Sequence, residues 1–261
     1  MVPPFARKRN ASARRTAEHA KEPEMAGFVD LHCHWIAQID DGARSPEESL
    51  AMLRGLRDAG FERVVATPHM RPGMFDNDRD RLIRAFDVMA EAVEAAGKTV
   101  PQVGLSSEHY FDDVVFQRLM SKQALPYPGG KAVLVELPTQ AFPARVHERL
   151  LDVRRTGLIV VLAHPERYRP VWDDASVLEP LIDAGVRLQL DICALVGKYG
   201  KLAQETAEML IEEEAYEIGA SDAHKQADID VVVKAIARLE TLVGKEETTR
   251  LLATAPHALS S

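Results

Sequence analysis

The chain has 261 residues, of which 46% are hydrophobic and 28% are charged, so it can bury the core of one large α/β domain or of two small ones. A net charge of -8 at pH 7 argues against a general nucleic-acid-binding protein, because no broad basic face would be available for phosphates. The sequence contains two cysteines, no apolar run long enough to cross a bilayer and no apolar segment of a secretory signal, so we expect a cytoplasmic protein without stable membrane insertion.

Residues 1–26 differ in character from the rest of the chain. Six basic residues lie among Ala, Ser and Pro without apolar periodicity: Arg7, Lys8, Arg9, Arg14, Arg15 and Lys21. This composition predicts a disordered basic tail, with binding to an anionic surface as the alternative, and one domain over residues 27–261. An alternative is that the natural protein begins at Met25 instead of Met1.

From residue 28 onward, short apolar runs alternate with amphipathic segments. The first helix is predicted to begin after Ser45, which forms a capping box with Glu48, and to end at Gly60. Further helices are predicted near residues 82–97, 114–119, 146–153, 175–184, 200–214, 229–242 and 246–252. Strands are predicted near residues 29–34, 63–66, 103–108, 132–136, 158–164, 186–191 and 217–224.

These segments form seven strand-then-helix units, and most of the strands are continuous apolar runs. Such runs are typical of parallel strands that are buried on both faces. The alternation is compatible with a barrel or with a doubly wound sheet. The sequence has no Gly-rich nucleotide fingerprint, and this favours the barrel.

The first predicted strand ends in a His-x-His pair. Side chains alternate along a strand, so His32 and His34 lie on one face and Cys33 lies on the other. Two imidazoles on one face can bind a single metal ion. The alternative is a pair of surface histidines that flank a thiol.

Potential metal ligands recur at the ends of most of the other strands. The candidates are His32, His34, His69, Glu108, Glu136, His164, Asp222 and His224, with Asp41 in the loop after the first strand. Active sites of (β/α) barrels lie at this carboxyl-terminal rim. Nitrogen and oxygen ligands in this number suit two or three divalent ions such as Mn, Fe or Zn, which could activate a water for phosphoryl or acyl transfer. The other histidines, His19, His109, His147 and His257, are given no functional role.

Arg167 follows the candidate ligand His164, and a guanidinium there could bind two oxygens of a phosphate. The alternative is a surface ion pair with Glu166 or another nearby acid. Arg44 and Arg71 are weaker candidates for substrate binding.

Together these residues resemble the PHP (polymerase and histidinol phosphatase) superfamily. Within it, the chain is most similar to the bacterial metal-dependent protein-tyrosine phosphatases linked to capsule and exopolysaccharide synthesis. The resemblance runs from about residue 28 to the C-terminal helices. It rests on the motifs DLHCH at 30–34, DDG at 40–42, TPH at 67–69, GMF at 73–75, EL at 136–137, HPERY at 164–168 and SDAH at 221–224, with Glu108.

The resemblance implies a distorted (β/α)7 barrel of PHP type with three divalent metal ions, manganese being expected and iron or zinc the alternatives. It implies one ion held by His32, His34, Glu108 and Asp222. A second would be held by Glu108, Glu136 and His164, and a third by Asp41, His69 and His224. Arg167 would bind the phosphate of a phosphotyrosine protein, expected to be a bacterial tyrosine kinase.

One departure from the family pattern concerns a second arginine, which some relatives carry shortly after the last histidine motif. Residues 225–229 contain none here, so Lys225 would be a poor substitute or the substrate preference would differ. A small-molecule phosphoesterase such as histidinol-phosphate phosphatase, and a non-catalytic metal-binding regulator, remain the alternative functions.

A cysteine nucleophile is the rival mechanism for a tyrosine phosphatase, and it requires an arginine six residues after the cysteine. That position holds Ile39 after Cys33 and Tyr199 after Cys193, so neither cysteine qualifies. We expect Cys33 to be a packing residue.

Overall fold

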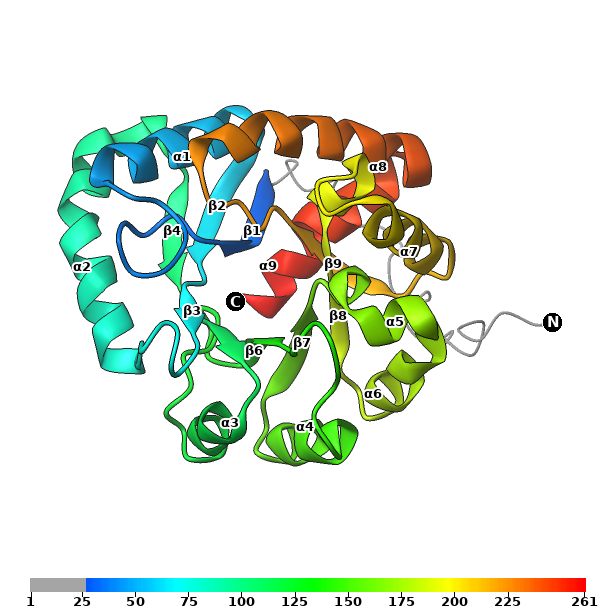
Figure 1. The fold of residues 1–261 in the computed structure, drawn as a ribbon. Helices are drawn as coiled ribbons and strands as arrows, with labels where there is room; N and C mark the ends of the chain where they lie inside the picture. The colour runs from blue at the N-terminus through cyan, green and yellow to red at the C-terminus, as the bar shows by residue number, and fades with distance from the viewer. Residues whose placement is uncertain (1–26) are drawn as a thin grey trace, which may run out of the picture.

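A computed structural model describes residues 27–261, and Figure 1 shows its strands in the centre with helices around them. The strands are β1 (Phe28–Cys33), β2 (Phe61–Ala66), β3 (His69–Met70), β4 (Gln102–Leu105), β5 (Glu108–Tyr110), β6 (Ala132–Glu136), β7 (Ile159–Ala163), β8 (Arg187–Asp191) and β9 (Tyr216–Ala220). The α-helices are α1 (Pro46–Asp58), α2 (Arg79–Ala96), α3 (Asp113–Met120), α4 (Val146–Arg155), α5 (Arg169–Asp173), α6 (Glu179–Asp183), α7 (Lys201–Glu212), α8 (Ile229–Thr249) and α9 (Ala255–Leu259).

The strands occupy seven positions around the molecule, because β3 continues the path of β2 and β5 continues that of β4. All pairings are parallel, in the orders β1-β2-β4 and β3-β5-β6-β7-β8-β9. Hydrogen bonds from Asp222 N to His32 O and from His34 N to Ala223 O, both 2.9 Å, connect the end of β9 to β1. The predicted distorted (β/α)7 barrel is therefore confirmed.

Local sequence signals account for several element boundaries. The side chain of Ser45 accepts a hydrogen bond from the backbone of Glu48 and caps α1, as the capping box predicts. The predicted break between two C-terminal helices is found at Gly244, whose φ of +79° interrupts α8. The short helix α5 was not predicted, since five residues are too few to show helical periodicity.

The apolar side chains form an outer layer under the helices and an inner layer inside the strands. Along β6, Ala132 and Leu134 belong to the inner cluster, whereas Val133 and Val135 belong to the outer one. Glu136 occupies the next inward position and therefore lies above the inner core. At the opposite end, Leu259 of α9 packs into the inner cluster, and Figure 1 shows α9 beside the central strands.

The pairing of strand β1 is irregular where the His-x-His pair begins. Val29 and Leu31 belong to the inner cluster, but Cys33 belongs to the outer one. The pairing of β1 with β2 is irregular between Asp30 and Cys33, and this irregularity accounts for the change of face. Consequently His32 and His34 lie toward the barrel interior, and Cys33 is a packing residue as expected.

The predicted basic tail, residues 1–26, lies outside the described residues, and a single domain over residues 27–261 stays a prediction. Among residues 27–261, no helix combines the length and the apolar character that crossing a bilayer requires.

Candidate metal centre and phosphate site

The nine candidate ligands converge at the carboxyl ends of the strands. Among residues 27–261, four groups of side chains have ligand atoms within 4.8 Å of one another. The groups are His34, Asp41, His69 and His224; His32, His164 and Asp222; His32, His34 and Glu108; and His69, Glu108 and Glu136. Most of these side chains are buried, whereas the side chain of Asp41 is 55% exposed. The cluster therefore has a buried floor and one accessible carboxylate at its rim.

Hydrogen bonds determine which ring nitrogens of the His-x-His pair are protonated. The amide of Gln189 donates to Leu190 O, so its oxygen, 2.9 Å from His32 Nδ1, accepts a hydrogen bond from that nitrogen. His34 Nδ1 likewise donates to Asp40 Oδ2 at 2.7 Å. In the neutral rings, both Nε2 atoms consequently carry lone pairs and can accept a metal ion.

These two Nε2 atoms face each other and the same carboxylates. They lie 3.2 Å apart, and His32 Nε2 is 3.1 Å from Asp222 Oδ1 and 3.3 Å from Glu108 Oε2. Lone pairs at these distances repel one another unless a cation lies among them. This part of the site therefore fits a divalent metal ion.

Glu108 links this pair to two further candidate ligands. Its Oε1 lies 3.0 Å from His164 Nε2, and its Oε2 lies 3.1 Å from His69 Nδ1. Glu136 Oε2 is buried and has no hydrogen-bond partner among residues 27–261, and the same holds for His164 Nδ1. Unpartnered buried lone pairs of this kind are costly without a ligand, so these residues also fit a metal ion.

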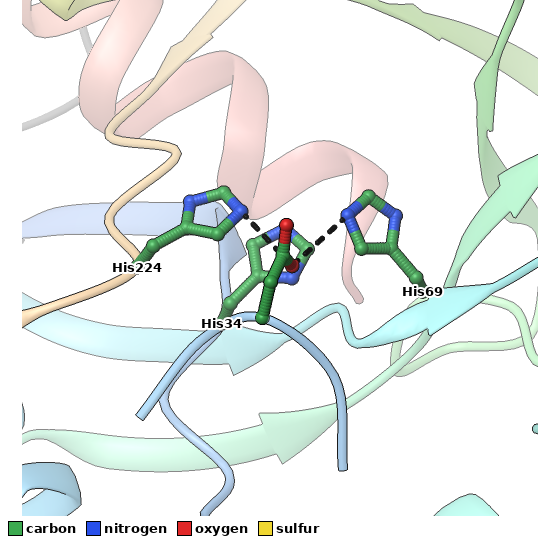
Figure 2. Close-up of side chains that lie close together, drawn as sticks. His34, His69 and His224 are labelled. Atoms are coloured by element: carbon green, nitrogen blue, oxygen red, sulfur yellow. Dashed lines mark ion pairs between the residues drawn. The ribbon is translucent and has the colours of Figure 1, made fainter. Parts of the chain in front are cut away.

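The most exposed part of the cluster is formed by three imidazoles and Asp41. Figure 2 shows His34, His69 and His224 close together, with dashed ion pairs from His69 and His224 to a carboxylate. His69 Nε2 lies 3.4 Å and His224 Nε2 lies 3.6 Å from Asp41 Oδ1. The ring of His34 stacks on that of His224, with the ring centroids 4.0 Å apart. The structure therefore brings His34 into this group as well as into the group around His32.

A family model described as "Capsular polysaccharide synthesis, CpsB/CapC" matches residues 28–260. The chain belongs to the CpsB/CapC family.

Several relatives are named tyrosine-protein phosphatases. YwqE of Bacillus subtilis is 30% identical over 198 residues, which cover 76% of this chain and 77% of YwqE. CpsB of Streptococcus agalactiae serotype V is 26% identical over 233 residues, which cover 86% of this chain and 94% of CpsB. The resemblance predicted from the motifs is thus confirmed.

Solved structures give the same result for the fold. A crystal structure from work on YwqE of Bacillus subtilis and CpsB of Streptococcus pneumoniae, described as unique metal-dependent tyrosine phosphatases, superposes with a TM-score of 0.80 at 27% identity. The match covers 89% of this chain and 94% of that one. A phosphotriesterase homology protein of Escherichia coli superposes with a TM-score of 0.59 at 11% identity, over 91% of this chain and 100% of that one, and this likeness concerns the fold alone.

The charges of the cluster in this CpsB/CapC family member favour a bound cation. Burial lowers the pKa of His32, but the carboxylates of Asp222 and Glu108 outweigh burial and raise the pKa to about 10. Burial and the neighbouring charge of Glu108 raise the pKa of Glu136 to about 7. Both shifts mean that the carboxylates are short of positive charge, which either protons or metal ions would supply.

Arg167 lies beside the ligand cluster. Its Nη1 is 2.6 Å from Asp222 Oδ2, and its side chain is 25% exposed. Asp222 Oδ1, which has no hydrogen-bond partner among residues 27–261, remains free for a metal. The alternative pairing with Glu166 is wrong, because that buried carboxylate accepts hydrogen bonds from Asp191 N and the Tyr216 hydroxyl instead.

The two weaker arginine candidates differ in their positions. The guanidinium of Arg71 stacks 4.0 Å above the ring of Tyr110, and its charge offsets a small part of the rise in the pKa of Glu136. Arg71 also pairs through its backbone with Phe75, whose ring stacks on that of His69 with centroids 5.3 Å apart. Arg44 is exposed, and within residues 27–261 its hydrogen bonds are made by its backbone.

Sequence reasoning missed the side chains that support the candidate ligands. Asp40 accepts hydrogen bonds from His34 Nδ1, from the backbone of His69 and from Gly42 N. Its place next to Asp41 in the DDG motif was a usable signal. Gln189 lies 157 residues from His32, so no local pattern could pair them.

Proposed function

We propose that this chain is a metal-dependent protein-tyrosine phosphatase that acts in the cytoplasm. Its proposed substrate is phosphotyrosine in a protein, specifically a bacterial tyrosine kinase of capsule or exopolysaccharide synthesis. The observation that carries the proposal is the buried cluster of histidine and carboxylate lone pairs that face one another beside the guanidinium of Arg167. The names of the relatives support the choice of phosphotyrosine.

The proposed cofactors are three divalent ions, with manganese expected and iron or zinc as alternatives. The proposed ligand sets are His32, His34, Glu108 and Asp222; Glu108, Glu136 and His164; and Asp41, His69 and His224. Such ions, when bound, would activate a water as the nucleophile and neutralise charge on the phosphate. Glu108 is suited to two sets, because its two oxygens face an imidazole of each set, with Oε1 3.0 Å from His164 Nε2 and Oε2 3.3 Å from His32 Nε2.

The chain's own contribution is to orient the phosphate. Arg167 is the proposed principal phosphate-binding residue, because one of its nitrogens is anchored on Asp222 and the guanidinium has further donors to offer. Arg71 is proposed as a second cationic group, supported by its effect on Glu136. Arg44 is a weaker proposal, because its contacts within residues 27–261 do not connect it to the cluster.

The test of this function compares two substrates with manganese present. We expect hydrolysis of a phosphotyrosine peptide to exceed that of histidinol phosphate, measured as kcat/KM by phosphate release. The reverse preference would support the small-molecule phosphoesterase instead. Hydrolysis of neither by folded, metal-loaded protein would support a non-catalytic regulator.

Gln189→Leu should weaken metal binding without unfolding the protein. The amide of Gln189 fixes the His32 ring and its tautomer, and loss of such a partner typically lowers metal affinity roughly 10- to 100-fold. The measurement is a manganese titration of the apoprotein. Gln204→Leu is the control, because Gln204 bonds Leu195 and Glu208 away from the cluster. Equal manganese affinity in Gln189→Leu and the parent would contradict this role.

A further inference from the structure

The segment between β8 and α7 brings an aromatic ring to the candidate phosphate-binding residue. The ring of Tyr199 lies under the guanidinium of Arg167, with Cζ 4.2 Å from the ring centroid. This segment was not among the motifs that indicated function, and Tyr199 is separated from Arg167 by the whole of β8.

Contacts of the neighbouring Lys198 connect the segment that carries this ring to the end of β9. The adjacent Lys198 lies 3.3 Å from Asp228 Oδ2 and 3.4 Å from Asp222 O. The backbone of His224 donates to the same Asp228 oxygen at 3.0 Å. The segment that carries Tyr199 is therefore tied to the segment that carries Asp222 and His224.

Arg167 is held on two sides by these contacts. Asp222 Oδ2 lies 2.6 Å and Asp191 Oδ2 3.8 Å from Nη1, and the Tyr199 ring lies against the guanidinium. A long side chain held in this way loses less freedom when it binds an anion, so the bound geometry is available beforehand. The Tyr199 hydroxyl is 3.5 Å from Asp222 Oδ2, which is long for a hydrogen bond, and it also interacts with Asp191, whose Oδ2 is 3.8 Å from Arg167 Nη1. The ring, in contrast, contacts the guanidinium directly.

We propose that Tyr199 is a positioning residue for phosphate recognition, whose ring holds the Arg167 guanidinium in its phosphate-binding orientation. The inference rests on the proposed function of Arg167. The proposed role depends on the aromatic ring, so Tyr199→Leu, which removes the ring, and Tyr199→Phe, which keeps it, are expected to give different results.

The test measures the affinity of manganese-loaded protein for inorganic phosphate by calorimetry. Tyr199→Leu keeps an apolar side chain but removes the cation–π contact, so we expect phosphate binding about tenfold weaker. Tyr199→Phe keeps the ring and should stay within about twofold of the parent. Leu202→Ala is the matched control, because Leu202 is 56% exposed on the following helix, and it should bind phosphate like the parent.

Melting temperature and manganese content are measured for each variant. If Tyr199 served folding alone, its substitution would change these two quantities and leave the phosphate affinity of each metal-loaded site unchanged. If Tyr199→Leu does not fold, Tyr199→Met repeats the test with a longer apolar side chain. Parent-like phosphate affinity in a folded variant without the ring overturns the proposal. So does an equal loss in Tyr199→Phe, which would assign the effect to the hydroxyl.

Arg167→Ala, measured in parallel, separates this inference from the proposed function. If Arg167→Ala weakens phosphate binding and Tyr199→Leu does not, only the inference about Tyr199 fails. If neither changes it, the role of Arg167 fails as well. If both weaken it while phosphotyrosine peptide is not hydrolysed, the inference stands and the proposed substrate is wrong.

Discussion

Chelation of divalent metals is expected to lower phosphotyrosine hydrolysis by about a thousandfold or more, and added manganese is expected to restore it. The candidate site offers imidazole and carboxylate groups whose lone pairs converge, and these groups bind metal ions. The measurement is phosphate release from a phosphotyrosine peptide by apoprotein, with and without added manganese, alongside metal analysis. Full activity in verified apoprotein would contradict a metal-dependent reaction.

Cys33→Ser provides the control for a thiol mechanism. The Cys33 thiol is buried in the outer core and lies 3.5 Å from Ala223 O. Burial and the nearby carboxylates of Asp30 and Asp222 raise the pKa of Cys33 well above its ordinary value, so the reactive thiolate is disfavoured. We therefore expect most of the activity to remain in Cys33→Ser. Loss of turnover in folded, metal-loaded Cys33→Ser would restore the thiol mechanism.

The barrel could be predicted because its strands are short apolar runs that end in polar residues. Ala132 to Glu136 is an example, since alternation places Ala132 and Leu134 in the inner cluster and Glu136 at the rim. The interruption of two strands was harder to foresee. The regular strands are interrupted after Ala66 and Leu105, where Pro68 lacks an amide hydrogen, although backbone bonds from Ser106 N to Ala66 O and from Glu108 N to Pro68 O still connect the two paths.

The candidate ligands could be found because each lies at the end of a predicted apolar strand or shortly after it, but the groups around them depend on distant parts of the chain. His32 was identified from its spacing to His34, whereas the hydrogen bond that orients its ring comes from Gln189 on β8. The sequence likewise placed Arg167 next to His164 but could not reveal its partner Asp222, 55 residues away. Such pairings are set by the order of strands around the barrel and leave no local pattern.

Arg167→Ala is expected to reduce kcat/KM for a phosphotyrosine peptide by roughly 30- to 1000-fold, which corresponds to about 2–4 kcal/mol of transition-state stabilisation. The guanidinium combines a permanent charge with a planar set of donors, and both are lost. Arg167→Lys keeps the charge but loses the planar donors, so its activity should fall between that of Arg167→Ala and that of the parent. Steady-state kinetics of manganese-loaded protein measures both effects.

Metal content should change little in Arg167→Ala, because the proposed metal ligands remain in place and Asp222 Oδ1 is not the oxygen that Arg167 contacts. The melting temperature should fall, because the buried Asp222 Oδ2 loses its partner, so activity is compared at a temperature where both proteins are folded. Arg169→Ala is the matched control. Arg169 lies two residues further on, its side chain is 62% exposed, and its ion pair is with Asp173 on the same short helix. A general effect of removing a positive charge near the site would lower activity in both Arg167→Ala and Arg169→Ala. Loss of phosphate binding by Arg167 would lower it in Arg167→Ala alone. If Arg167→Ala hydrolyses the peptide as fast as the parent, phosphate must be bound elsewhere, and Arg71, which lies over the ring of Tyr110 at the end of β5, becomes the next candidate.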